Sequence, residues 1–544
     1  MADPLISADR HPGRWIVRLL RAYGIETVFG IPGVHTVSLY AGLAGSGIRH
    51  VTPRHEQGAG FMADGYARVT GKPACCFVIA GPGVTNIATA MAQAYGDSIP
   101  MLVISTVGDR RHLGRGLGQL HELPDQTTLA RSFTAFSHTL NDLAHLPEVM
   151  DRAFAVFNSA RPRPVHIQIP LDLWSQPAPE APAECRSTEA ARALASPAPD
   201  RIAAAADALA AAERPLILAG GGAAGAGAEL AALAENLDAP VVTTVNGRGL
   251  LPADHALSVP VSPSMEAVRE LMRASDLALA VGTELAPTDY DMYETGMPTL
   301  PRPLVRIDVD RDQLMRPQAP DIAVLADASL GLRAVHERRA GPVSAGTFGR
   351  RRADATRRAA AAALPANMAA AGRFLTILRD ALPGAVMVGD STQPVYAGNL
   401  MFAAARPRQW FNSATGYGTL GYALPAALGA SLGAPDRPVV CLIGDGGLHY
   451  SLGELAAIQQ TGRPVIVLVW DNRGYGEIKT ALQDAGAEPV GVDLFTPDFR
   501  ALAGAYGMTA EAPDSLADLP DMLRAAAARH GGTLVHLAER VVLG

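Results

Sequence analysis

The most informative polar residues of the chain lie in the segment 444–479, GDGGLHYSLGELAAIQQTGRPVIVLVWDNRGYGEIK. Asp445 follows the apolar run 439–443 (VVCLI), and Asn472 follows the next apolar run, 465–470 (VIVLVW). If both runs are strands of one parallel sheet, a crossover helix separates them and their carboxyl ends lie at the same edge. Doubly wound sheets bind ligands in the crevice outside that edge. The spacing therefore predicts that Asp445 and Asn472 face one ligand site.

One carboxylate and one amide oxygen suit a hard cation such as Mg²⁺, which takes few protein ligands together with phosphate oxygens. Gly446 and Gly447 leave backbone N–H groups at a helix N-terminus free to approach a phosphate. The pattern predicts a metal-bridged diphosphate. The alternative, a tight turn with Asp445 as a helix cap, explains GDGG alone but not Asn472 and the turn 473–476 (RGYG) after it.

The elements that position these residues alternate short β-branched runs with longer helical patterns, which is typical of parallel sheets covered on both faces. Helices are expected over 84–95 and 448–460, and strands over 75–80, 101–105, 216–219, 241–245, 277–281, 439–443 and 465–470. The pattern predicts an α/β protein of three doubly wound parallel-sheet domains. Two stretches of linker-like composition, 175–200 and 338–371, divide the chain into domains over 1–175, 198–338 and 371–544.

The chain has 544 residues, of which 48% are hydrophobic, and a formal net charge of −7. This length suits about three domains. The mildly acidic balance without a basic block argues against a nucleic-acid or membrane-surface partner, and no apolar run is long enough to span a membrane. The N-terminus lacks a secretory pattern, so a cytoplasmic protein is expected. The four cysteines, Cys75, Cys76, Cys185 and Cys441, form no C-x-x-C motif, which excludes a disulfide scaffold and a cysteine-rich zinc module.

Asp445, the 27-residue spacing to Asn472, and Gly474 two positions later resemble the thiamine-diphosphate-binding motif of the family of acetolactate synthases and 2-oxo acid decarboxylases. In that family, the aspartate, the asparagine and the glycine carbonyl hold Mg²⁺ against the cofactor diphosphate. The family usually has two asparagines where this chain has Asp471-Asn472, and the matching ligand is the second residue. The resemblance implies thiamine diphosphate and Mg²⁺ as cofactors, with Asp445, Asn472 and Gly474 as the metal ligands.

A second segment, 54–73 (RHEQGAGFMADGYARVTGKP), resembles the pyrimidine-binding segment of the same family. There a glutamate bonds N1′ of the aminopyrimidine, and the proton shared at N1′ lets the 4′-amino group remove the C2 proton of the thiazolium. An apolar pocket that raises the carboxyl pKa favours such acid–base work. The resemblance implies that Glu56 is this catalytic and cofactor-binding residue. Taken alone, a glutamate between a strand and a helix is more often a partner of the helix dipole.

The resemblance implies the remaining cofactor contacts as well. Gly418 would supply a carbonyl to the 4′-amino group, and Leu420 would be the apolar wedge beneath the cofactor, with a plain core leucine as the alternative. The first domain would then bind the pyrimidine, the third the diphosphate, and the middle domain would be Rossmann-like. The other residues implied to contact the cofactor are Gly83, Ser391, Thr392, Gln393, Gly444, Gly446, Gly447 and Tyr475.

Two further residues are candidates for contact with the substrate. His121 stands where acetolactate synthases usually have a glutamine, and a histidine there could donate a proton; a surface imidazole in a loop is the alternative. Glu477 falls where family members place side chains against the substrate. It could pair with a cationic substrate tail or act as an acid at a helix N-terminus.

The middle domain contains Gly220-x-Gly222-x-x-Gly225 after an apolar run, formally a dinucleotide fingerprint. Such spacing arises easily in a glycine- and alanine-rich stretch, and no acidic residue ends the following strand. Acetolactate synthases carry FAD in this domain, whereas decarboxylase relatives carry nothing or a nucleotide. A nicotinamide is not expected, and FAD is left open without being favoured.

Several stretches, among them LHELPDQ, NRGYGEIK and PVGVDLFTPDF, are most similar to decarboxylases of 5-guanidino-2-oxopentanoate (2-ketoarginine). The resemblance implies decarboxylation of a small 2-oxo acid to an aldehyde and CO₂. The alternatives are an acetolactate-synthase-like carboligase that joins two 2-oxo acids, and a non-catalytic cofactor-binding regulatory protein. Glu56 of one subunit meets the metal site of another in such proteins, so a homodimer or homotetramer with active sites between subunits is expected.

Overall fold

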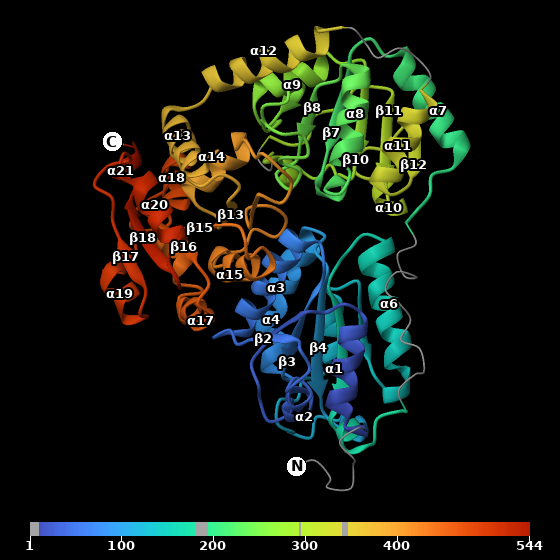
Figure 1. Cartoon of the computed structure of the whole chain (residues 1–544), viewed down its shortest axis with the longest axis vertical. Coiled ribbons are helices and arrows are strands. Elements are labelled where there is room, and N and C mark those ends of the chain that lie inside the picture. The colour runs from blue at the N-terminus through green and yellow to red at the C-terminus, as the bar shows by residue number, and fades with distance from the viewer. Residues whose placement is uncertain (1–9, 181–193, 293–294, 340–345, 544) are drawn as a thin grey trace.

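The computed structural model describes residues 10–180, 194–292, 295–339 and 346–543. Within them the chain forms three domains, each built on a six-stranded sheet in which every strand pair is parallel (Figure 1). This confirms the predicted fold class. Cys185 and parts of both expected linkers lie outside the described residues.

The N-terminal domain has the strand order β2-β1-β3-β4-β6-β5. Its strands are β1 Thr27–Gly30, β2 Arg49–Val51, β3 Ala74–Val78, β4 Met101–Val107, β5 Phe136–Thr139 and β6 Val165–Pro170. Its α-helices are α1 Pro12–Ala22, α2 Val37–Ala41, α3 Glu56–Thr70, α4 Pro82–Gly96, α5 Gln126–Arg131 and α6 Leu146–Ser159. Strands β3 and β4 are buried along their whole length, as expected for parallel strands covered on both faces.

The middle domain has the strand order β12-β11-β10-β7-β8-β9. Its strands are β7 Pro215–Ala219, β8 Val241–Thr243, β9 Ser258–Val259, β10 Leu277–Val281, β11 Leu304–Asp308 and β12 Ile322–Leu325. Its α-helices are α7 Pro199–Ala211, α8 Gly227–Leu237, α9 Glu266–Arg273, α10 Arg311–Leu314, α11 Ala328–Arg338 and α12 Phe348–Ala362. Helix α12 comes from the alanine-rich linker-like stretch, and its Ala353 and Ala360 pack into the core of this domain.

The C-terminal domain has the strand order β14-β13-β15-β16-β18-β17. Its strands are β13 Val386–Gly389, β14 Trp410–Asn412, β15 Val439–Gly444, β16 Val465–Asp471, β17 Thr509–Glu511 and β18 Thr533–Ala538. Its α-helices are α13 Ala366–Ala381, α14 Gln393–Met401, α15 Ala423–Gly433, α16 Asp445–Leu448, α17 Glu454–Thr461, α18 Gly476–Asp484, α19 Phe499–Ala505, α20 Leu519–Ala527 and α21 Arg540–Leu543. The single helix expected over 448–460 is wrong: α16 ends at Leu448, and α17 begins at Glu454 after a turn.

The first and third domains share one hydrophobic core. It combines residues of β3 and α3 with residues of β15, β16 and α15, whereas the outer faces of the two sheets have cores of their own. Helix α15 lies directly beside α3 (Figure 1). A Cβ at Gly429 would lie 1.9 Å from the Met62 carbonyl oxygen, and one at Gly65 would lie 2.0 Å from the Ala426 carbonyl oxygen. The two helices therefore touch backbone to backbone, which only glycine permits.

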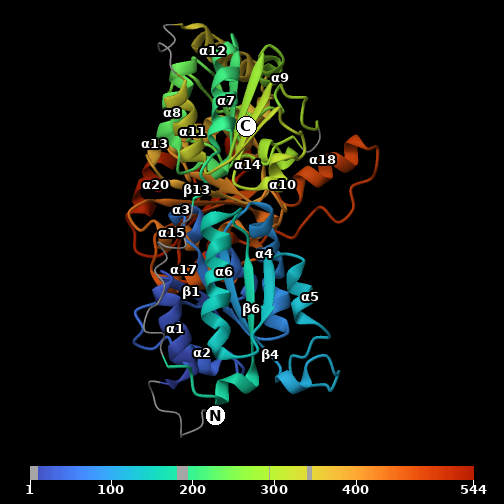
Figure 2. The same ribbon diagram turned by 90° about the vertical axis from the view of Figure 1, so that its right-hand side faces the viewer.

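Helix α18 differs from its neighbours because it has no buried residue, and it projects from the body of the molecule (Figure 2). Among the described residues, no single helix is long and apolar enough to cross a membrane; α12 and α13 pass that test only as a pair, with a 116° bend between them.

Candidate active site

Strands β15 and β16 are hydrogen-bonded neighbours, with Gly444 opposite Trp470. Their carboxyl ends therefore lie side by side, and the structure brings Asp445 and Asn472 together as the spacing predicted. The Asn472 amide lies with one terminal atom 2.9 Å from the Gly474 carbonyl oxygen and 3.2 Å from Asp445 Oδ1. If this atom is the amide oxygen, it converges with Asp445 Oδ1 and the Gly474 carbonyl oxygen, and no proton lies between the three oxygens. If the amide is turned, its nitrogen donates hydrogen bonds to Asp445 Oδ1 and to the Gly474 carbonyl oxygen.

This donor set fits a small hard cation. A carboxylate, an amide oxygen and a peptide carbonyl are the oxygen ligands that Mg²⁺ accepts, and the rest of its octahedron is left for phosphate and water. Burial and the nearby charge of Asp471 raise the pKa of Asp445 to about 6, and a bound cation would favour its ionised form. Among the described residues, no cluster of three or more His, Cys, Asp and Glu side chains offers another metal site.

Backbone geometry holds the carbonyl of Gly474 in this position. Gly474 has φ = +156° and forms an isolated antiparallel bridge with Asp493. A Cβ at Gly474 would lie 2.1 Å from the Val492 carbonyl oxygen, which accepts a hydrogen bond of 2.9 Å from the Tyr475 amide. Glycine is therefore required at position 474, and the chain from 491 to 494 supports the turn.

Gly444, at the end of β15, and Gly446, just after it, let other side chains approach the backbone beside the metal ligands. A Cβ at Gly446 would lie 2.7 Å from the Tyr475 ring, and one at Gly444 would lie 3.1 Å from Thr392 Oγ1. Tyr475 is hydrogen-bonded to Tyr450, which raises the pKa of Tyr475. Thus Gly446 lies against Tyr475 and Gly444 against Thr392, which are all residues predicted from the sequence.

The loop after β13 carries the other predicted diphosphate contacts. The buried Asp390 accepts hydrogen bonds from the amides of Ser391, at 3.0 Å, and Ala423, at 3.1 Å, and burial raises its pKa to about 6. A Cβ at Gly447 would lie 3.1 Å from Asp390 Oδ1. Asp390 therefore ties the loop of Ser391 to the start of α15, and it was not singled out from the sequence. Thr392 precedes α14 as its N-cap, and Gln393 is the first helical residue.

Glu56 is the first residue of α3, at the carboxyl edge of the N-terminal sheet. Asn86 Nδ2 donates to Glu56 Oε2 at 2.9 Å, which leaves Oε1 for another partner. Asn86 lies on α4, whose second residue is Gly83. The predicted residues Glu56 and Gly83 therefore lie at the starts of two helices that pack together.

Glu454 of the C-terminal domain supports the peptide before Glu56. Its Oε1 accepts hydrogen bonds from the amides of Arg54, at 2.9 Å, and His55, at 3.1 Å. Only 2% of Glu454 is exposed, and burial raises its pKa to about 7. Sequence reasoning missed this residue because its partners lie about 400 positions away.

His121 has φ = +63° and lies against Gly81, whose Cβ would be 2.6 Å from the His121 carbonyl oxygen. Its ring packs edge-on against that of His35, with the centroids 5.0 Å apart. Burial and the neighbouring His121 lower the pKa of His35. His35 was missed, although it follows β1 at the same carboxyl edge and the strand-end argument applied to Asp445 would have found it.

Glu477 is the second residue of α18. Its charge is the second cause, after burial, that raises the pKa of Tyr396 to about 12. Tyr396 belongs to α14, the helix that begins at Gln393. Glu477 is thus near the helix that follows the diphosphate loop. In the part of the chain that the structure describes, no hydrogen bond or ion pair joins Glu56 to Asp445, Asn472 or Gly474.

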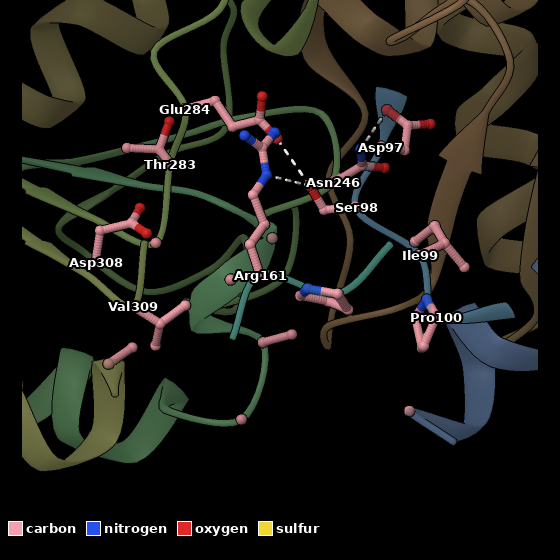
Figure 3. Close-up of a pocket in the computed structure, with 18 of the residues that line it drawn as sticks. Asp97, Ser98, Ile99, Pro100, Arg161, Asn246, Thr283, Glu284, Asp308 and Val309 are labelled. Carbon is pink, nitrogen blue, oxygen red and sulfur yellow. Dashed lines mark hydrogen bonds and ion pairs between the residues drawn. The ribbon is translucent and has the colours of Figure 1, made fainter. Parts of the chain in front are cut away.

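A cavity of about 360 Å³ lies where the three domains meet, and it is lined in part by Gly221, Gly222 and Gly225 of the glycine-rich turn of the middle domain. Arg161 of the N-terminal domain crosses it toward Glu284 and Ser98 (Figure 3). Arg161 forms an ion pair with Glu284 and donates to Ser98 Oγ at 2.8 Å. The charged side chains of Arg161 and Glu284 therefore meet in the cavity beside the glycine-rich turn.

Comparison with known proteins shows to which protein family the chain belongs. Three family models match in order: the N-terminal TPP binding domain of thiamine pyrophosphate enzymes over residues 10–129, their central domain over 202–335, and their C-terminal TPP binding domain over 390–537. Thiamine pyrophosphate (TPP) is thiamine diphosphate. The chain belongs to the thiamine pyrophosphate enzyme family of acetolactate synthases and decarboxylases.

Three individual relatives show which enzymes of this family the chain is similar to. The chain is 47% identical to the probable 2-ketoarginine decarboxylase AruI of Pseudomonas aeruginosa, over 96% of this chain and 93% of that protein. It is 32% identical to the acetolactate synthase isozyme 1 large subunit of Escherichia coli, over 96% and 93% of the two chains. It is 29% identical to the chloroplastic acetolactate synthase of Arabidopsis thaliana, over 94% and 78%. The chain is therefore a thiamine-diphosphate-dependent enzyme that acts on 2-oxo acids.

Proposed function

We propose that this enzyme decarboxylates 5-guanidino-2-oxopentanoate without oxidation, giving 4-guanidinobutanal and CO₂, with Mg²⁺ as its metal ion. The observation that carries the proposal is the 47% identity, over nearly the full length of both chains, to a probable 2-ketoarginine decarboxylase. Asp445, Asn472 and Gly474 support Mg²⁺, because with the Asn472 amide oxygen turned inward they offer only oxygen ligands.

The residues of the chain have separate roles in this proposal. When bound, thiamine diphosphate supplies the nucleophilic carbon and the electron sink for loss of CO₂. Glu56 shares a proton with N1′ of the aminopyrimidine through Oε1, while Asn86 holds Oε2. His121, paired with His35, supplies a proton on the substrate side. Asp445, Asn472 and the Gly474 carbonyl hold the cation that neutralises the diphosphate.

In this proposal, Glu477 makes the enzyme selective for a substrate that carries a guanidinium group. A carboxylate on an exposed helix next to the diphosphate loop suits a guanidinium at the far end of a short chain, because guanidinium and carboxylate pair with two parallel hydrogen bonds. We expect Glu477→Gln to lower kcat/KM for 5-guanidino-2-oxopentanoate roughly 10- to 100-fold, the size of a lost charge-assisted hydrogen bond. We expect less than about a twofold change for pyruvate, which has no group for Glu477 to bind.

The experiment assays the purified enzyme with thiamine diphosphate, Mg²⁺ and a panel of 2-oxo acids, and it identifies the products. Asp484→Asn, which removes a negative charge from the last residue of the same helix, is the matched control. An aldehyde from 5-guanidino-2-oxopentanoate, with a selective loss in Glu477→Gln only, supports the proposal. A higher kcat/KM for another 2-oxo acid overturns it. Acetolactate formed from pyruvate as the main product would favour the carboligase alternative, which the 32% identity to the E. coli acetolactate synthase supports.

A further inference from the structure

The loop 413–421, between β14 and α15, carries Gly418 and Leu420, and its own backbone does little to fix its shape. Gly416, Gly418 and Gly421 have φ values of +63°, +74° and +78°, in the left-handed region that glycine enters freely. Within this loop, one backbone hydrogen bond joins the Gly418 amide to the Thr415 carbonyl oxygen, at 3.4 Å. A loop of this composition needs contacts from outside to keep one conformation.

Gln93 of α4 supplies these contacts. Its Nε2 donates to the Thr415 carbonyl oxygen at 3.0 Å, and its Oε1 accepts from the Thr419 amide at 3.4 Å. One side-chain amide thus holds the residues on both sides of the segment 416–418. Gln93 is fully buried and belongs to the N-terminal domain, whereas the loop belongs to the C-terminal domain.

A buried ion pair holds Gln93 in turn. Gln93 Nε2 also donates to Asp97 Oδ2 at 3.0 Å, and the same oxygen accepts from Thr415 Oγ1 at 3.0 Å. Asp97 pairs with Arg68 at 2.5 Å, and the side chains of the two are 0% and 4% exposed. Arg68 also bonds Asn246 of the middle domain at 3.0 Å. The position of the Gln93 side chain is therefore fixed by side chains that lie where all three domains meet.

We propose that Gln93 is a positioning residue for the cofactor: it sets the conformation of the loop 413–421 so that the Gly418 carbonyl and the Leu420 side chain meet the aminopyrimidine and the ring beside it. This proposal rests on the proposed function, because Gly418 and Leu420 are taken from the family resemblance to be cofactor contacts. Only an amide can serve here, since the position needs a donor toward Thr415 and Asp97 and an acceptor toward Thr419. A carboxylate would face Asp97 with a second negative charge.

The test compares Gln93→Met and Gln93→Glu with the wild-type chain and with Gln459→Met. Gln459 is a matched control because its amide also bridges two backbone groups, of Gly507 and Gly532, far from the loop in sequence. The first measurement is amide hydrogen exchange of the peptide 413–421 in the protein without cofactor. We expect at least about tenfold faster exchange in both Gln93 variants, from the loss of two or more hydrogen bonds, and no change in Gln459→Met.

The second measurement is deuterium exchange at C2 of bound thiamine diphosphate with Mg²⁺, together with kcat and the cofactor dissociation constant. We expect the exchange rate and kcat to fall about tenfold or more in the Gln93 variants, while the dissociation constant changes about threefold or less because the diphosphate contacts remain. Unchanged loop exchange in Gln93→Met overturns the proposal, as does faster loop exchange with normal C2 exchange. If the Gln93→Glu variant fails to fold, Gln93→Met decides. A wild-type protein with no decarboxylase activity would instead refute the proposed function, since the loop measurement needs no substrate.

Discussion

Carboxyl groups in and around the site interact with residues that lie far from them in the sequence. Asn86 donates to Glu56 Oε2, and Glu454 accepts from the two peptide amides before Glu56. Asp390 is buried but accepts several backbone hydrogen bonds, and burial still raises its pKa to about 6. For Asp390 and Glu454, backbone donors lower the pKa and burial raises it, and burial is the larger effect.

Replacing Glu56 tests the proton-sharing role directly. Glu56→Gln keeps the acceptor for Asn86 but removes the exchangeable carboxyl proton, so we expect activity to fall by at least about a hundredfold, the scale of a lost general acid–base group. Thiamine diphosphate binding should persist, because its diphosphate is held by the other domain. Steady-state assays and titration calorimetry with cofactor and Mg²⁺ measure the two effects. A variant with near-wild-type activity would remove Glu56 from the mechanism.

The raised pKa of Glu454 makes stability depend on pH. The native carboxyl, with a pKa of about 7 against an ordinary 4.5, binds its proton more tightly than the unfolded one. The contribution of Glu454 to the free energy of unfolding is therefore full below pH 4.5 and is lost as the pH rises toward 7 and above. Glu454→Gln stays neutral and should flatten this slope.

We expect urea unfolding at pH 8 to show Glu454→Gln more stable than the wild type by on the order of 1–3 kcal/mol, since one pKa unit corresponds to about 1.4 kcal/mol. Glu454→Ala is the contrasting variant, because it leaves the amides of Arg54 and His55 without their acceptor and should destabilise the chain at every pH. Equal pH slopes for Glu454→Gln and the wild type would contradict the assignment.

At the scale of elements, the contact between α3 and α15 decides where Glu56 lies relative to the C-terminal domain. The two helices approach so closely that Gly65 and Gly429 face carbonyl oxygens of the opposite helix. Glu56 begins α3, and the loop of Gly418 leads into α15, so the contact fixes where each of these two predicted cofactor groups lies within its chain.

Gly429→Ala should destabilise the protein through this contact. Its Cβ would lie 1.9 Å from the Met62 carbonyl oxygen, and overpacking of this kind costs about 1–3 kcal/mol. Gly504→Ala in α19 is the matched control: nothing lies within 4 Å of its Cβ, and alanine favours a helix over glycine by up to about 1 kcal/mol. Chemical unfolding of the two variants should therefore shift in opposite directions, and equal shifts would count against the close helix contact.

At the scale of the whole molecule, the described chain holds two half-sites that do not bond each other: Glu56 with Asn86, and Asp445 with Asn472 and Gly474. We predict that the active site is completed by a second subunit. The exposed helix α18, which carries Glu477, projects from the body of the molecule (Figure 2).

Subunit mixing tests this assembly. Glu56→Gln and Asp445→Ala chains should each be inactive alone. If sites form between subunits, a mixed dimer contains one site with both changes and one wild-type site, so unfolding and refolding the two together should restore up to about a quarter of wild-type activity, because half of randomly paired dimers are mixed and half of their sites are intact. No recovery, with mixed dimers confirmed by mass spectrometry, would place each site within one chain.

The sequence predicted what depends on strand ends and local motifs. The three parallel sheets, the neighbouring strands β15 and β16, and the proximity of Asp445 to Asn472 follow from the apolar runs and the helical crossover between them, and the structure shows all three. Glu454, Asp390 and Gln93 could not be predicted, because each acts on a partner that the fold brings from another part of the chain. The break between α16 and α17 was missed because the apolar spacing of 448–460 continues across the turn.

The shared core of the first and third domains has a consequence for the chain as it leaves the ribosome. Helix α3 ends at Thr70, but its partner α15 begins only at Ala423. At roughly 5–20 residues per second, the nascent polypeptide carries α3 uncovered for about 20 to 70 seconds before α15 is synthesised. In the folded enzyme, the small-residue face of α3 packs closely against α15. During translation, chaperones and neighbouring nascent chains can reach this face.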